Sequence, residues 1–227
     1  MILISYDMTI IDLIAASTNA FVGALLARRP DHFRGYTRIG IVLLALVGGI
    51  GGGVARDIIL NQVPAAFTNP LYVILCVIMG ILALTISYRA GRKTYRKRSA
   101  EGGAHIKEGA LNYMAAFSLP WYAVIGVDKA LGVGLPVLPA IIIGIIGPTT
   151  GRFIVDLTSG VTPKHFVQGE FYVTTAILTS ILYYLLYSIG LSIWPATLIS
   201  VAFGFTFRTV VWRKGWEEKE PWEPKKG

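Results

Sequence analysis

Seven long apolar stretches constrain this chain more than any other feature of its sequence. A helix needs about 20 mostly apolar residues to cross the hydrocarbon core of a bilayer. Stretches of about that length occur at residues 8–27, 39–59, 69–88, 109–129, 135–157, 169–188 and 193–212. Only 15% of the residues are charged, and 54% are hydrophobic. We therefore predict an all-α membrane protein with seven transmembrane helices.

An internal repeat groups the first six stretches into two sets of three. The segment LVGGIGGGVARDIILNQVP at 46–64 matches GPTTGRFIVDLTSGVTP at 147–163 when the chain is shifted by 99 residues. The shift superposes Gly48, Gly52, Asp57 and Pro64 on Gly147, Gly151, Asp156 and Pro163. Upstream, IAASTNAF at 14–21 matches MAAFSLPW at 114–121 with a shift of 100. Because three is an odd number of crossings, the second set must be inverted relative to the first.

The repeat and the charges divide the chain into five parts. We expect a first three-helix repeat at 8–88, a basic cytoplasmic linker at 89–108 and a second, inverted three-helix repeat at 109–188. A seventh helix follows at 193–212, and a charged cytoplasmic tail at 213–227. Inverted repeats of this kind place a site for an ion or a small solute at the midplane, between paired interrupted helices.

Lysine and arginine gather in alternate connections between the predicted spans. Four lie between the first two spans, seven between the third and fourth, one between the fifth and sixth, and six from Arg208 to the end. The positive-inside rule then places the N-terminus outside and the C-terminus in the cytoplasm of a plasma-membrane protein. This placement also explains the net charge of +8 without a nucleic-acid partner. The cluster at 92–98 could in addition attract anionic membrane lipid, although topology alone accounts for it.

Glycine interrupts the second and fifth spans near the bilayer midplane. Each glycine costs a helix roughly 1 kcal/mol relative to alanine, so we expect unwound backbone at both breaks. Backbone carbonyls and threonine hydroxyls there would suit K⁺ or Na⁺, with no other metal and no cofactor required. The residues expected to line a pore at the two breaks are Gly48, Gly49, Gly51, Gly52, Gly53, Gly147, Pro148, Thr149, Thr150 and Gly151.

Four charged residues follow these breaks: Arg56, Asp57, Arg152 and Asp156. An ion buried in a membrane span costs several kcal/mol unless it is paired or hydrated, so all four should face the interior. They could line the pore, or they could tie the two halves together as Arg56–Asp156 or Asp57–Arg152 pairs. The glycines also form GxxxG patterns, which commonly mark helix packing. The same choice, packing or pore lining, applies to Ser17, Thr18 and Asn19 in the first span.

The sequence does not favour an enzyme. No histidine falls within a predicted span, so a base or metal ligand is missing there, and Cys76 is the only cysteine. A channel and a secondary transporter of a small solute remain, because both can use broken helices in inverted repeats.

The sequence GGGVARD at 51–57, followed by Pro64, two three-span repeats and a seventh span, resembles the prokaryotic branch of the trimeric intracellular cation channels. The resemblance implies a homotrimer with one pore in each protomer, permeable to monovalent cations including K⁺. It also implies that the second and fifth spans line that pore. The second repeat departs from the motif, since Val155 stands opposite Arg56, and Arg152 stands opposite Gly53.

Lys129 lies near the outer end of the fourth span and has two interpretations. It could extend to the membrane interface, its charge satisfied by water, headgroups or the neighbouring Asp128. Alternatively, the resemblance implies a lysine on this span that obstructs the pore. An ammonium group at a narrow mouth repels K⁺, and its movement through the membrane field makes the obstruction voltage dependent.

Overall fold

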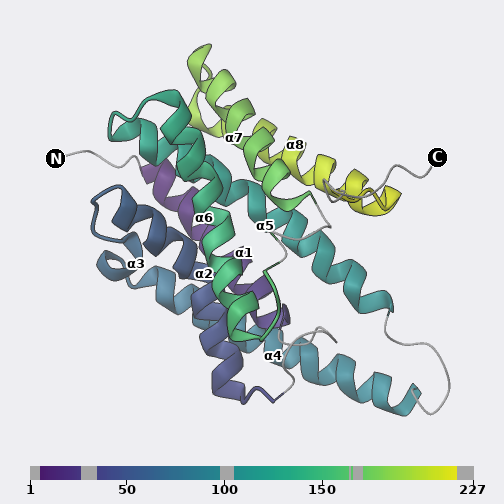
Figure 1. The fold of residues 1–227 in the computed structure, drawn as a ribbon. Helices are drawn as coiled ribbons and strands as arrows, with labels where there is room; N and C mark the ends of the chain where they lie inside the picture. Colours follow the sequence, from purple (N-terminus) through teal and green to yellow (C-terminus); the bar gives the residue numbers. More distant parts are fainter. Residues whose placement is uncertain (1–5, 27–34, 98–104, 164, 166–170, 219–227) are drawn as a thin grey trace.

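The chain folds into a bundle of helices, shown in Figure 1. The computed structural model describes residues 6–26, 35–97, 105–163, 165 and 171–218. In these ranges the helices are α1 (Tyr6–Leu26), α2 (Arg38–Ile59), α3 (Ala65–Thr68), α4 (Leu71–Lys97), α5 (His105–Gly132), α6 (Val137–Thr158), α7 (Tyr172–Ser188) and α8 (Ile193–Lys214). Each predicted span corresponds to one helix, and the short α3 occupies the connection between the second and third spans.

Among the residues that the structure describes, four helices are long and apolar enough to cross a membrane: Met8–Leu26, Arg38–Ile59, Val137–Thr158 and Ile193–Lys214. Leu71–Thr85 and Tyr172–Ser188 are shorter apolar helices. The prediction of an all-α membrane protein is therefore confirmed. The segment expected to be a linker at 89–108 is helical at both ends, because α4 continues to Lys97 and α5 begins at His105. Its central part, 98–104, and the tail from 219 onward lie outside the described residues.

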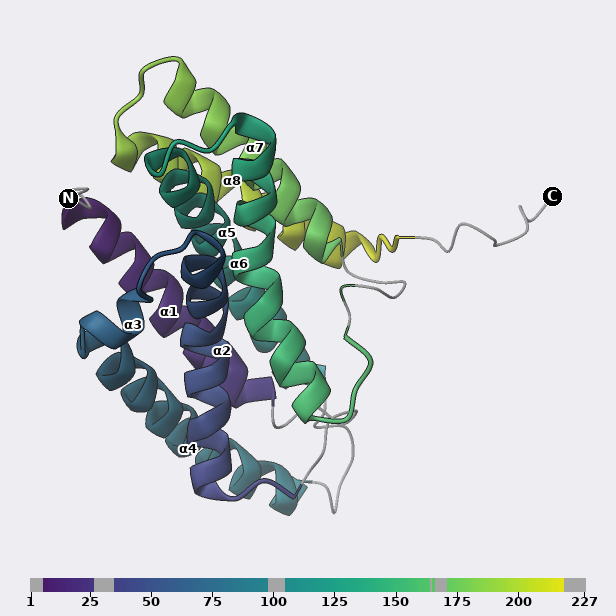
Figure 2. The same ribbon diagram turned by 60° about the vertical axis from the view of Figure 1, so that its left-hand side comes forward.

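The helices pack as two similar groups. α1 packs against α2 and α4, while α5 packs against α6 and α7. The groups meet where α1 crosses α5 and where α2 lies beside α6, as Figures 1 and 2 both show. α8 covers α5 and α7 on the far side of the second group. Many of the buried residues in these contacts are small, such as Ala16, Ala20 and Ala45, which lets the helix backbones approach closely.

The ends of α2 and α6 have matching geometry. Asn61 follows α2 with φ 55°, and Gly160 follows α6 with φ 69°. Both residues therefore adopt the left-handed conformation that commonly terminates helices. The next backbone N–H returns to the carbonyl of the aspartate five residues earlier, from Gln62 to Asp57 over 2.8 Å and from Val161 to Asp156 over 3.0 Å. Two segments 99 residues apart thus end their helices in the same way, and each carries its aspartate in the last turn.

Candidate functional site

The glycines of α2 and α6 form a contact between helix backbones. A Cβ atom at Gly52 would lie 2.0 Å from the carbonyl oxygen of Gly147, and one at Gly151 would lie 3.0 Å from that of Gly48. Side chains at these positions would force the helices apart. The predicted unwinding is wrong, because both helices continue without a break through 48–53 and 147–151. The intrinsic cost of glycine in a helix is offset here by close packing, which the sequence pattern alone does not reveal.

The hydroxyls expected to serve as cation ligands bond to their own helix. Thr149 donates to the carbonyl of Ile145 at 2.8 Å, and Thr150 donates to that of Ile146, also at 2.8 Å. The carbonyl of Pro148 accepts a hydrogen bond from the Tyr172 hydroxyl at 3.0 Å. Each of these groups therefore has a hydrogen-bond partner within the bundle.

A buried cluster of four charges joins α1, α2 and α5. Arg56 donates from Nη2 to Oδ2 of Asp12 at 2.9 Å and from Nε to Oδ1 of Asp57 at 2.8 Å. The exposed fractions of Asp12, Arg56 and Asp57 are 2%, 1% and 2%. Tyr72 of α4 adds a hydrogen bond from its hydroxyl to Asp12 at 3.2 Å. The second oxygen of Asp57 accepts from the backbone N–H of Ala65 at 3.1 Å, so this carboxylate also fixes the start of α3.

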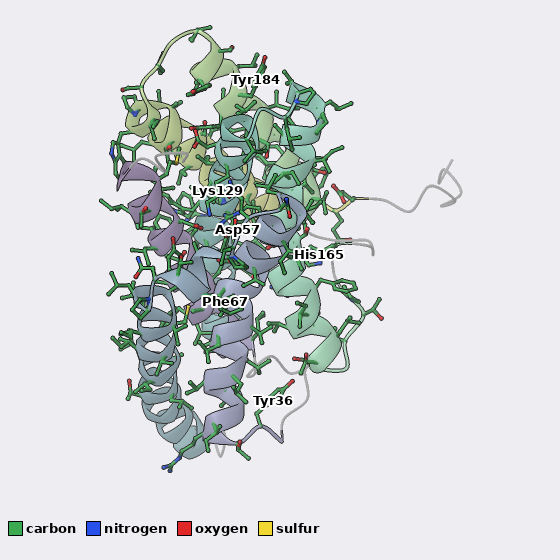
Figure 3. All side chains as sticks on the ribbon, turned by 90° about the vertical axis from the view of Figure 1, so that its left-hand side faces the viewer. Tyr36, Asp57, Phe67, Lys129, His165 and Tyr184 are labelled. Atoms are coloured by element: carbon green, nitrogen blue, oxygen red, sulfur yellow. The ribbon has the colours of Figure 1, made fainter. Side chains whose placement is uncertain are left out.

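Lys129 completes this cluster from the second half of the chain. Its Nζ lies 3.1 Å and 3.2 Å from the two carboxylate oxygens of Asp57, and 3.1 Å from Oδ2 of Asp12. Figure 3 shows Lys129 and Asp57 close together within the bundle. The lysine side chain is only 8% exposed, so the interpretation as an interfacial anchor is wrong. Its expected partner Asp128 instead accepts a hydrogen bond from Tyr183 at 2.7 Å.

The charges on α6 pair within their own helix. Arg152 donates from Nε to Oδ1 of Asp156 at 2.7 Å, one helical turn away. In the structure, Arg56 pairs with Asp12 and Asp57, so the predicted Arg56–Asp156 and Asp57–Arg152 pairs are not the ones that join the halves. Lys129 makes ion pairs that do join them, because its partners Asp12 and Asp57 lie on α1 and α2.

Two small cavities lie near the two ends of the glycine contact, and we name them outer and inner after the orientation that the charges predict. The outer cavity borders the charge cluster and is lined by Asp12, Ile50, Gly53, Val54, Arg56, Asp57, Ala65, Ala66, Tyr72 and Tyr122. The inner cavity is lined by Asn19, Val22, Gly23, Leu26, Gly48, Ala115, Ser118, Arg152, Val155 and Tyr172. Helices α1, α2 and α5 contribute to both cavities. Of the predicted pore residues, Gly48, Gly53, Arg56, Asp57 and Arg152 therefore line a cavity.

Several residues of this site were absent from the predicted set. Asp12 is a carboxylate within an apolar span, a signal that marks functional sites in membranes and that could have identified it. No comparable pattern marks Tyr72 or Tyr122, because tyrosine is common in membrane helices. Among the small polar residues of α1, Ser17 and Thr18 donate to carbonyls of their own helix. Asn19 donates across to the carbonyl of Ser118 at 3.2 Å and lines the inner cavity.

Comparison with known proteins agrees with this architecture. The sequence model of a family described as glycine transporter matches residues 9–88 and 112–188. A UPF0126 membrane protein of Vibrio cholerae is 30% identical over 211 residues, which cover 91% of this chain and 77% of the relative. The UPF0126 inner membrane protein YadS of Escherichia coli K12 is 24% identical over 176 residues, which cover 76% of this chain and 75% of the relative.

Solved channel structures share the fold. A trimeric intracellular cation channel orthologue from Rhodobacter sphaeroides superposes with a TM-score of 0.78 and 25% identity, covering 93% of this chain and 100% of the channel chain. The resemblance to prokaryotic members of that channel family, which the motif at 51–57 indicated, is thereby confirmed. Since the family model matches more than half of the sequence, the chain belongs to the family described as glycine transporter, and its fold is that of the prokaryotic trimeric intracellular cation channels.

Proposed function

We propose that this protein is a homotrimeric channel for monovalent cations, permeable to K⁺, with one pore in each protomer. The observation that carries the proposal is the cluster of Asp12, Arg56, Asp57 and Lys129, which lies at the outer cavity. Burying ions costs several kcal/mol each, and intramembrane charges commonly mark ion pathways. The channel fold of the solved Rhodobacter sphaeroides relative supports the same assignment.

The proposed pathway runs through each protomer from the outer cavity to the inner one, between α2 and α6 and beside α1 and α5. The side chains along it include Asp12, Asp57, Asn19 and Arg152. Carboxylate and amide oxygens are suitable ligands for a hydrated or partly hydrated monovalent cation. In this structure the backbones of α2 and α6 touch beside this path, at Gly52 and Gly147.

Lys129 is the proposed obstruction on the outer side. Its ammonium group lies among three carboxylate oxygens, an arrangement that a permeating cation would also favour. A tethered positive charge at this point competes with K⁺ for the same oxygens and repels it. Withdrawal of the lysine would leave Asp12 and Asp57 facing Arg56 alone, with an excess of one negative charge.

We further propose seven spans in two inverted repeats plus α8, in the plasma membrane, with the N-terminus outside and the C-terminus in the cytoplasm. The two segments matched by the family model and the matching ends of α2 and α6 support the repeat. The distribution of lysine and arginine supports the orientation. The name of the Escherichia coli relative, an inner membrane protein, supports the location. Transport of this kind requires no catalysis and no cofactor.

Planar-bilayer recording of the purified protein under a KCl gradient tests the proposal. We expect discrete unitary currents that reverse near the K⁺ equilibrium potential, and none in bilayers without protein. Reversal near the Cl⁻ equilibrium potential would contradict cation selectivity. The absence of unitary currents from correctly inserted trimers would contradict a channel.

The family description supports a second candidate, a secondary transporter that takes glycine as its solute. Arg56 and the adjacent Lys129 are complementary to a carboxylate, and Asp12 and Asp57 to an ammonium group, so the charges at and beside the outer cavity are those that a zwitterion requires. The channel has the stronger support, because the structural relative covers the whole fold. Uptake of radiolabelled glycine into proteoliposomes under an imposed Na⁺ or proton gradient, without unitary current, would instead establish the transporter.

A further inference from the structure

The hydroxyl of Tyr122 makes a buried hydrogen bond that the charge cluster does not require. Tyr122 lies on α5 and donates to the backbone carbonyl of Gly49 on α2. The tyrosine is 2% exposed, and Gly49 is buried as well. This bond therefore joins the two halves of the molecule, as Lys129 does, but through a neutral side chain and a helix carbonyl.

The bond lies between the two cavities. On α2, Gly48 lines the inner cavity, whereas Ile50 and Gly53 line the outer one, and Gly49 lies between them. On α5, Ser118 lines the inner cavity and Tyr122 the outer cavity, one helical turn or about 6 Å along the axis. The tyrosine side chain thus reaches across the short barrier that separates the two spaces.

On one side, the ring of Tyr122 faces Gly53, which has no side chain. A Cβ atom at Gly53 would lie 3.6 Å from Nη2 of Arg56, 3.7 Å from the Tyr122 hydroxyl and 3.8 Å from its Cε1, all ordinary van der Waals separations. Room for a methyl group therefore remains beside the ring at Gly53, which lines the outer cavity. By contrast, a Cβ at Gly49 would lie 2.5 Å from Sγ of Cys76, so the acceptor itself is held firmly against α4.

We propose that Tyr122 is a gate of the pore, an inference that rests on the proposed channel function. In the closed state its hydroxyl donates a hydrogen bond to the Gly49 carbonyl, and its ring separates the cavities. When the ring rotates toward the space beside Gly53, the cavities join and the carbonyl oxygen of Gly49 faces the pathway. Backbone carbonyls of this kind replace water around permeating K⁺. The gate is distinct from Lys129, which acts by charge at the outer end of the same path.

The substitution Tyr122→Phe tests the gate, because it removes the hydroxyl and keeps the ring. A neutral hydrogen bond contributes about 1 kcal/mol, so we expect the ratio of open to closed times to rise about fivefold. Unitary conductance and the reversal potential should stay at the values of the parent protein. The matched control is Tyr36→Phe, which removes the hydrogen bond from Tyr36 to Ser159 at 2.8 Å, away from both cavities. It should leave the open probability unchanged.

A second variant keeps the proposal testable if Tyr122→Phe does not assemble. Gly53→Ala fills the space beside the ring without a steric clash and favours the helix, so we expect it to lower the open probability at unchanged unitary conductance. If the parent protein conducts but either variant shows the parental open probability, the gate is refuted. The proposed channel function would still stand. A parent without unitary currents would overturn both.

Discussion

The ammonium group of Lys129 lies among carboxylate oxygens from two helices of the other half of the chain. Its position next to Asp128 in the sequence suggested a local pair, but adjacent residues on a helix point in different directions. Lys129 faces the bundle interior, while Asp128 faces Tyr183 on α7. A long side chain near a helix end can extend toward water or toward the interior, and only the placement of Asp12 and Asp57 decides between them.

We expect Lys129→Gln to raise the cation current several-fold and to flatten its dependence on voltage. The substitution removes a positive charge from the proposed pathway, and a charge that moves through the membrane field contributes up to about 2.3 kcal/mol per 100 mV. Single-channel recording over a range of voltages measures both effects. The control is Lys214→Gln, at an exposed lysine at the end of α8. Parental open probability and voltage response in Lys129→Gln would exclude this role for the lysine.

A titration experiment addresses His165, which lies in the connection between α6 and α7. Burial is the main cause that lowers its pKa to about 4, assisted by Arg152 and Arg208 and opposed by Asp156. The unfolded chain, with a pKa of about 6.5, therefore binds more protons than the folded protein between pH 6.5 and 4. Stability contributed by the neutral imidazole is complete above pH 6.5 and falls as the pH decreases toward 4.

We accordingly expect the thermal midpoint of the purified protein to fall from pH 7 to pH 4.5, and to fall less steeply in His165→Gln. Differences between parent and variant remove the shared effect of titrating carboxylates. Parallel curves for the two proteins would show that His165 does not contribute to the acid sensitivity.

Part of this site could be predicted from residues alone. Arg56 and Asp57 were identified because charges in an apolar span must have partners. Their actual partners were not, since a pairing between helices depends on which faces meet. Asp12 and Lys129 lie 117 positions apart in the sequence, yet their charged atoms are 3.1 Å apart.

At the scale of single helices, α2 and α6 show how glycine can indicate two different structures. Apolar runs and the residues after them predicted these helices at 39–59 and 135–157, against the observed Arg38–Ile59 and Val137–Thr158. The prediction that their interiors unwind is wrong, because both helices are continuous. Five glycines within 48–53 weaken an isolated helix, but the same absence of Cβ atoms permits backbone contact with Gly147 and Gly151. Helix propensity is a local property, and the partner that outweighs it lies on another helix.

Two neighbouring glycines of α2 provide a matched pair of substitutions. A Cβ at Gly52 would lie 2.0 Å from a backbone oxygen that cannot move away, so Gly52→Ala should destabilise the protein by about 3 kcal/mol. A Cβ at Gly51 would lie 3.8 Å from its nearest neighbour, so Gly51→Ala should be neutral or stabilising by up to about 1 kcal/mol. The fraction of protein that remains monodisperse on size exclusion after heating measures both. Equal effects of the two substitutions would contradict the backbone contact.

At the scale of the whole molecule, large apolar side chains face outward along α4, including Ile74, Ile78 and Ile81, each about half exposed. Such surfaces face either lipid or another protomer. We expect three copies to associate, and graded cross-linking of the protein in mild detergent should produce bands up to the trimer and none beyond it. Products that stop at the dimer would contradict a trimeric assembly. Denaturation in SDS before cross-linking provides the control, and only monomers should then remain.

The contact of α2 with α6 has a mechanical consequence for the two halves. Because glycines meet there without side chains, the helices are closest at one point, which lies near the middle of α6 and about two-thirds along α2. If the two helices slid along each other, larger side chains would enter the contact. A change in their crossing angle would not bring those side chains there. A rotation of about 10° would displace a helix end 11 residues away by about 3 Å, since a helix rises about 1.5 Å per residue. The helices can therefore rotate about this contact, and a small change in crossing angle displaces the helix ends by about the width of a water molecule.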